Sequence, residues 1–112
     1  MPPDHLRDAL EEIFRYERAL PAIRQAGIEA LHRLLPIAQG HSGQSGVIGR
    51  FLLGLYNGQD YPFDMTELRR LDVALFDDCI TALRLDNTTE REVHRYFQNG
   101  DTIWEELRNQ WA

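Results

Sequence analysis

The stretch "GHSGQSG", from Gly40 to Gly46, decides between two fold classes, because it looks both like a nucleophile elbow and like a loop between two helices. A nucleophile elbow reads G-x-S-x-G and stands between a strand and a helix. Neither Ser42 nor Ser45 has a glycine two residues later, and the segment before the stretch has helical periodicity. A phosphate-binding P-loop needs a lysine, and the sequence contains none. We therefore interpret Gly40 as a helix end and Ser42 or Ser45 as the cap of the next helix.

Helical periodicity continues on both sides of this loop and predicts an all-α fold, a single compact bundle of five to seven short helices. Residues 1–112 form one domain by length. A first helix starts near Asp4 and ends at Leu20, where Pro21 favours a break. We expect residues 1–20 to be an N-terminal helix at the periphery of a core over 21–112, and the sequence leaves open whether it docks on that core. Apolar spacing and caps predict the remaining helices over 21–36, 47–57, 64–71, 72–86, 89–99 and 103–111.

Several of these boundaries depend on particular capping residues. Gly58 is placed to end its helix in the left-handed conformation. Asp64 with Glu67, and Thr89 with Glu92, match the capping-box spacing.

Two glycines inside the third predicted helix, Gly49 and Gly54, each lower its intrinsic stability by roughly 1 kcal/mol relative to alanine. Glycine at such positions indicates close approach of another helix. We interpret both residues as packing positions.

The charge of the chain is acidic and unevenly distributed. The formal net charge is −6, and residues 59–112 carry twelve acids against six arginines. This balance disfavours direct nucleic-acid binding, which relies on neutralising phosphates. The N-terminus lacks an apolar signal region, and the longest apolar run is short and interrupted by Arg50, so we expect a cytoplasmic protein without a membrane segment.

The residue types needed for catalysis or metal binding are present but poorly arranged. Cys79 and His94, with Asp77 or Asp78, could be imagined as a nucleophile with its base, yet Cys79 falls on the apolar arc of its predicted helix and is interpreted as core. Glu90 and His94 share a helix face, but the Glu-x-x-His spacing of di-iron sites would need a glutamate at position 91. We therefore predict no catalytic residue, no metal site and no cofactor.

Arg69 and Arg70, followed by a tight joint and a helix, permit a helix-turn-helix interpretation. The second helix would then present Asp77 and Asp78 to the phosphates, which disfavours it.

The acids of the second half suggest an anionic surface for a basic partner. An equally simple interpretation is that they only keep the protein soluble. The candidate partner-binding residues are Glu67, Asp77, Asp78, Asp86, Glu90 and Glu92.

From residue 31 to residue 111 the chain resembles a family of short, uncharacterised proteins carried on plasmids, integrative conjugative elements and prophages of proteobacteria. The resemblance implies an accessory mobile-element protein, a class that often binds and redirects host machinery, as anti-CRISPR proteins do. The family has no established activity, so the resemblance assigns no catalytic residue. The stretches that carry it are "GHSGQS", "FLLGLYNG", "PFDMTELRRLD", "LFDDC" and "EVHRYFQNG".

We therefore expect a non-catalytic protein-interaction module that binds a basic surface of a host protein or complex. Inhibition of a complex that handles nucleic acids, through its groove of arginine and lysine, is the preferred form of this hypothesis. The alternatives are a DNA-binding regulator of the mobile element and, less favoured, a small hydrolase that uses Ser42 or Cys79.

Overall fold

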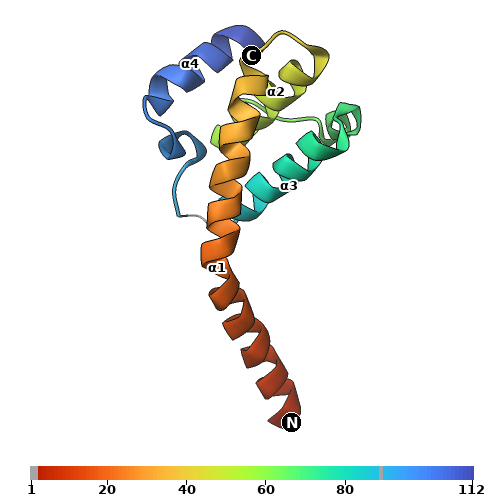
Figure 1. Ribbon diagram of the computed structural model, residues 1–112, viewed down its shortest axis with the longest axis vertical. Helices are drawn as coiled ribbons and strands as arrows, with labels where there is room; N and C mark the ends of the chain where they lie inside the picture. The colour runs from red at the N-terminus through yellow and green to blue at the C-terminus, as the bar shows by residue number, and fades with distance from the viewer. Residues whose placement is uncertain (1–2, 89) are drawn as a thin grey trace.

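The computed structural model describes residues 3–88 and 90–112, and over these residues the fold is all-α, as the sequence predicts (Figure 1). The order of the helices is α1 (Pro3–Ala38), α2 (Gly43–Tyr56), the 3-10 helix η1 (Met65–Arg70), α3 (Val73–Asp86), the 3-10 helix η2 (Val93–Tyr96) and α4 (Gly100–Trp111).

The predicted break at Pro21 is wrong, because α1 passes through this proline without interruption. Proline removes the hydrogen bond to the carbonyl four residues earlier, which belongs to Glu17. Both residues are exposed, so water can solvate that carbonyl. The helix changes direction near its middle in Figure 1, which is the usual response to an internal proline.

The second half of α1 packs against α2 and α3, while the first half projects from the rest of the molecule (Figure 1). The principal extents are 56 × 30 × 25 Å and the radius of gyration is 16.5 Å. A compact domain of this length has a radius of gyration of about 13 Å. A compact bundle is therefore present only after the projecting half of α1, which is exposed from residue 4 to residue 19.

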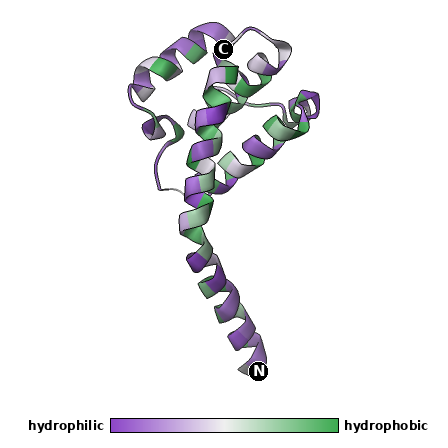
Figure 2. Ribbon diagram, in the orientation of Figure 1, coloured by the Kyte–Doolittle hydropathy of each residue, from purple (hydrophilic) through white to green (hydrophobic). Residues whose placement is uncertain are grey.

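The core lies where the second half of α1, α2, α3 and α4 meet. Trp104 on α4 is its largest fully buried side chain, and its indole Nε1 donates a hydrogen bond to the carbonyl of Leu52, 3.3 Å away. Figure 2 shows apolar residues along the helices that meet there, and also along the projecting half of α1. The other fully buried large residues are Leu31, Leu34, Ile48, Leu52, Leu53, Leu85 and Leu107.

The glycine–serine loop turns the chain, as predicted. The Ser42 hydroxyl accepts a hydrogen bond from the Ser45 amide, and the Ser45 hydroxyl accepts one from the Ser42 amide, each at 3.1 Å. This reciprocal pair caps α2 at its N-terminus. The Gly40 amide donates to the carbonyl of Ile37, which closes the end of α1.

Replacing Ser42 with alanine is expected to lower the free energy of unfolding by about 1 kcal/mol, because an orphan amide at the start of α2 loses its acceptor. Ser45→Ala keeps the capping hydroxyl and is expected to cost less. Urea denaturation followed by far-UV circular dichroism measures both. Stoichiometric labelling of either serine by a serine-directed phosphonate would contradict the capping role.

The predicted cap at Gly58 differs from the structure. Asn57, in an extended conformation, ends α2, and its side-chain oxygen accepts hydrogen bonds from the amides of Gln59 and Asp60. Gly58 is therefore not needed as a left-handed cap, and no described glycine has a positive φ.

Asp64 caps η1 through the Thr66 amide at 2.9 Å, but Glu67 does not complete a capping box. Its carboxylate is bound by Arg50 of α2 instead. The predicted Thr89–Glu92 box lies outside the described residues, because Thr89 does.

The prediction that Gly49 allows close packing is confirmed. A Cβ at Gly49 would overlap the indole of Trp111 on α4. At Gly54 a Cβ would lie 3.2 Å from the Cβ of Phe63, in the segment before η1. α1 also lies close to α3 at a different glycine, Gly27, where a Cβ would overlap that of Leu85.

Candidate protein-interaction surface

Three of the six acids predicted to bind a partner are engaged by arginines of the same chain. Asp78 on α3 accepts hydrogen bonds from Nε and Nη2 of Arg33 on α1, at 2.8 to 3.3 Å. Glu90 lies 2.7 Å from Nε of Arg24, also on α1. These pairs tie later segments to α1, so their charge is largely neutralised within the fold.

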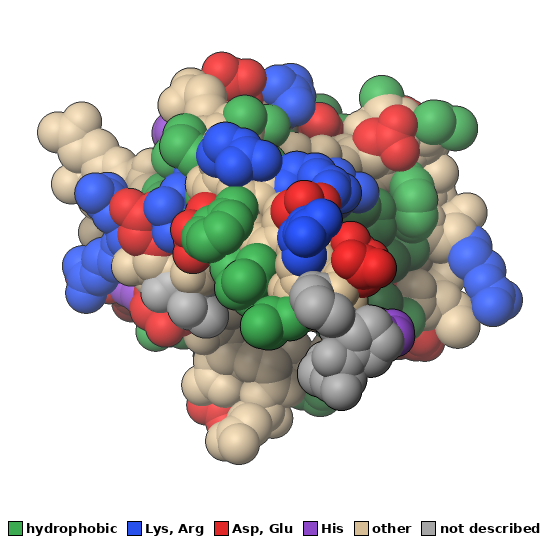
Figure 3. Space-filling model, turned by 90° about the horizontal axis from the view of Figure 1, so that it is seen from below, with side chains coloured by type: hydrophobic (Ala, Val, Ile, Leu, Met, Phe, Trp, Pro, Cys, Tyr) green, Lys and Arg blue, Asp and Glu red, His purple; other side chains and the backbone are tan. Residues whose placement is uncertain are grey.

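Glu67 is engaged in the same way. Its carboxylate accepts a hydrogen bond of 2.9 Å from Nε of Arg50 and lies 3.4 Å from Nη1 of Arg70. The view in Figure 3 accordingly shows acidic and arginine side chains intermingled on the surface. The six acids do not form one uniform anionic face.

Among the described residues, Asp77, Asp86 and Glu92 have no ion-pair partner. Asp86 and Glu92, with Glu90 and Arg91, line a surface hollow of about 340 Å³ whose apolar wall is Leu55. We call these five residues the Asp86 corner. Burial, together with the neighbouring charge of Glu92, raises the pKa of Asp86 above its ordinary value. The corner therefore contains a carboxylate whose charge the chain leaves uncompensated.

Replacing Asp86 with asparagine is expected to stabilise the protein at neutral pH. The pKa of Asp86 is higher in the folded than in the unfolded state, so ionisation disfavours folding at pH values above the unfolded pKa. This disadvantage disappears as the pH falls through the folded pKa, and the variant should then lose its advantage. Urea denaturation at a series of pH values measures the difference, with Asp77→Asn as the control. A variant less stable than wild type at neutral pH would contradict this.

Cys79 and His94, which were considered for catalysis, are both buried in the fold. Cys79 is fully buried, and burial, with the charge of Asp78, raises the pKa of its thiol to about 12, so the nucleophilic thiolate is not formed at neutral pH. His94 is buried against the rings of Tyr56 and Trp104, and its Nε2 faces Oδ1 of Asp101 at 3.3 Å.

The remaining candidates for catalysis or metal binding also contact other side chains of the same chain. The hydroxyl oxygens of Ser42 and Ser45 are hydrogen-bonded to one another at 2.9 Å. Glu90 and His94, considered as metal ligands, are paired with Arg24 and Asp101 respectively. Within the described part of the chain, no group of three or more histidine, cysteine or acidic residues is placed to hold a metal ion.

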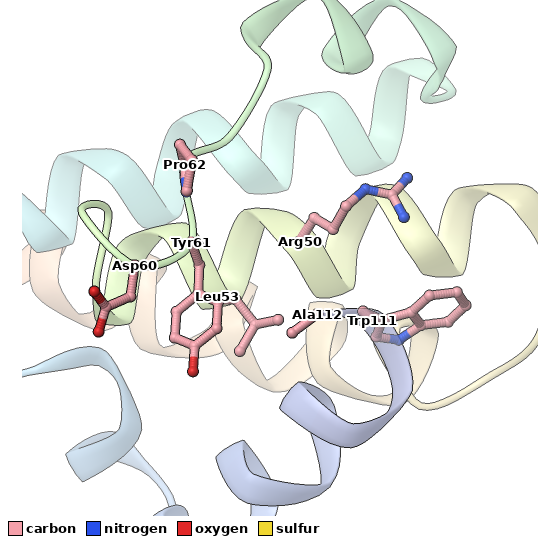
Figure 4. A pocket seen from close by; sticks show the side chains of 7 residues that line it. All are labelled: Arg50, Leu53, Asp60, Tyr61, Pro62, Trp111 and Ala112. Atoms are coloured by element: carbon pink, nitrogen blue, oxygen red, sulfur yellow. The ribbon is translucent and has the colours of Figure 1, made fainter.

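A second hollow, of about 330 Å³, lies between α2, the segment before η1 and the end of α4 (Figure 4). Two of its polar side chains, Arg50 and Trp111, are already bound within the fold. The guanidinium of Arg50 is held by Glu67, and the indole Nε1 of Trp111 donates to the carbonyl of Ala38 at 2.7 Å. In Figure 4 the guanidinium of Arg50 points away from Tyr61. The lining residues are Arg50, Leu53, Asp60, Tyr61, Pro62, Trp111 and Ala112.

One surface was not identified as a site from the sequence. Four large apolar residues on the projecting half of α1 are about half exposed, and we call them the α1 stripe. The periodicity places Leu6, Leu10 and Ile13 on one helix face, with Phe14 at its edge, but it does not reveal that no described residue of the chain covers that face. The stripe consists of Leu6 (58 % exposed), Leu10 (42 %), Ile13 (52 %) and Phe14 (50 %).

Fold and surface together define an all-α protein with a projecting amphipathic helix and with a surface corner where Asp86 and Glu92 have no ion-pair partner among the described residues. The chain belongs to DUF7673, a family of unknown function whose family model matches residues 28–112. No curated protein and no solved structure matches it. The family match begins within α1, so the α1 stripe lies outside it. None of the described helices combines the length and the apolar character needed to cross a membrane.

Proposed function

We propose that this protein is a non-catalytic protein-interaction module that binds a basic surface of a host protein or complex through the acids of α3 and the segment after it. The observation that carries the proposal is the Asp86 corner, where carboxylates gather around a hollow and the pKa of Asp86 is raised. An arginine or lysine of a partner would compensate this charge and form charge-assisted hydrogen bonds with it. Asp77 is exposed too, but it lies two and a half turns before Asp86 on α3 and therefore on the opposite side of that helix, outside this surface.

The resemblance to proteins of plasmids, conjugative elements and prophages supports a more specific form of the proposal. In this form the protein acts in the cytoplasm and inhibits a host complex that handles nucleic acids, in the manner of anti-CRISPR proteins. It occupies the arginine- and lysine-lined groove that otherwise holds the nucleic acid. The alternative with a structural basis is a DNA-binding regulator, since Arg69 and Arg70 are exposed at the end of η1.

The test is binding of the protein to a partner captured from a bacterial lysate, compared with binding to duplex DNA. The double variant Asp86→Asn, Glu92→Gln removes charge at the corner. The matched control, Glu105→Gln with Glu106→Gln, removes the same charge from exposed positions of α4. We expect the corner variant to weaken partner binding roughly tenfold or more and the control to change it little, with wild-type binding falling as salt rises.

Two results would reject the proposal. Equal effects of the corner and control variants would show that only net charge matters. Salt-sensitive binding of wild-type protein to DNA, strengthened by either double variant, would favour the DNA-binding regulator.

A further inference from the structure

The α1 stripe is an interaction surface that the proposed function does not use. Its residues lie on one face of a helix that is exposed along residues 4–19. Leu6, Leu10 and Phe14, with Arg7 and Glu11, also line a shallow hollow of about 420 Å³ along one side of this face. A contiguous exposed apolar patch of several hundred Å² is often a functional surface.

We propose that the stripe pairs with the same stripe of a second copy of this chain, with the two helices antiparallel. The distribution of charge along the helix favours this orientation. Residues 4–12 carry four acids and one arginine, whereas residues 13–20 carry two arginines and one acid. Antiparallel pairing sets the acidic part of each helix beside the basic part of the other. Parallel pairing sets like charges side by side.

The spacing of the apolar residues fits a two-fold axis near Ile13. Ile13 then meets its own counterpart, and Leu6 of each copy meets Leu20 of the other, because both are seven residues from Ile13. Glu11 and Arg18 lie on the same flank of the stripe. In this register Glu11 faces position 15 of the other copy, so the Arg18 of that copy is three residues, or about 4.5 Å, along the axis and within reach of its long side chain.

The shape of the molecule permits this arrangement. The projecting segment is about 25 Å long at 1.5 Å per residue. The bundle lies beyond one end of the projecting segment (Figure 1), so two such segments laid antiparallel place the two bundles at opposite ends of the pair. A large half-exposed side chain leaves roughly 100 Å² uncovered, so the two stripes of four side chains bury roughly 800 Å², somewhat below the area of about 1,000 Å² that a stable specific interface buries. The pairing is therefore reversible and depends on protein concentration, and the dimer presents two Asp86 corners.

The acidic character of the helix argues against a lipid surface as the occupant. Residues 4–20 carry five acids against three arginines and no lysine, and anionic lipids repel such a segment. Interfacial helices that bind membranes have basic polar faces.

The test is the molar mass of the full chain by sedimentation equilibrium, from about 1 to about 300 µM, the range expected for a small interface. Wild type is expected to pass from monomer to dimer. Ile13→Asp places two charges together at the axis and is expected to raise the dissociation constant at least about tenfold. Asp8→Asn, on the opposite face of the helix, is the control and should leave it nearly unchanged. Far-UV circular dichroism checks that Ile13→Asp retains the helical bundle.

A charge swap tests the orientation of the helices. Glu11→Arg and Arg18→Glu are each expected to weaken the dimer roughly two- to tenfold, and the double variant is expected to restore it. The proposal is overturned if wild type stays monomeric throughout the range or if folded Ile13→Asp dimerises like wild type. It is also overturned if the double swap fails to restore pairing, or if monomeric wild type instead co-sediments with vesicles of anionic phospholipid.

Discussion

Replacing Trp104 with alanine is expected to lower the free energy of unfolding by about 3–5 kcal/mol, the largest effect of any single truncation in this fold. The side chain is 1 % exposed and packs against the rings of His94 and Phe97. Its removal leaves a cavity where α4 and α2 meet, and the Leu52 carbonyl loses its indole donor. Urea denaturation followed by far-UV circular dichroism measures the loss.

Trp104→Phe is the matched control, because it keeps most of the volume and removes only the indole hydrogen bond. It should cost clearly less than the alanine variant. A loss below about 1 kcal/mol for Trp104→Ala would be typical of a surface position and would show that Trp104 is not part of the core.

Gly27→Ala is expected to lower the free energy of unfolding by about 1–3 kcal/mol, although alanine is the better helix former by about 1 kcal/mol. The new Cβ would overlap the Cβ of Leu85, which is fixed to the backbone of α3, so the two helices must separate. Thermal and urea denaturation of the variant measure the cost.

Gly43→Ala provides the comparison, because it also adds a methyl group to a helical glycine. There the new Cβ would lie 3.5 Å from Nη2 of Arg70, an ordinary contact with a flexible side chain. This variant should be neutral or slightly stabilising. Equal stability of the two variants would contradict the close approach of α1 and α3.

The parts of the fold that depend on local sequence could be predicted from it. Ser42 and Asp72 cap α2 and α3 through amides three residues away, so their signals lie within one turn of helix. The break at Pro21 could not be decided locally, because the cost of an internal proline depends on whether water reaches the freed carbonyl. The sequence pattern also does not separate a 3-10 helix from a short α-helix, so the 3-10 geometry of η1 and η2 could not be predicted.

The candidate site could be predicted only in part, for a related reason. The excess of acids after residue 58 is visible in the sequence, but their partners are not. Arg33 meets Asp78, and Arg24 meets Glu90, across long separations that only the packing of α3 and the later segment on α1 brings together. Asp86 differs from these acids because it is partly buried beside Glu92 and has no arginine partner, which is a tertiary property. The sequence pattern shows that the residues of the α1 stripe are apolar and regularly spaced. It does not show that no described residue of the chain packs on them.

The most direct test of the proposed function is the pKa of the Asp86 carboxyl, followed by carbon-13 NMR in the free protein and in complex with the captured partner. The free protein is expected to show a pKa above the ordinary aspartate value, because the charge is half-buried and lies beside Glu92. Binding of a basic surface at the corner should lower it, since a cation stabilises the ionised form. A pKa of Asp86 that stays unchanged when the partner is bound would contradict the account.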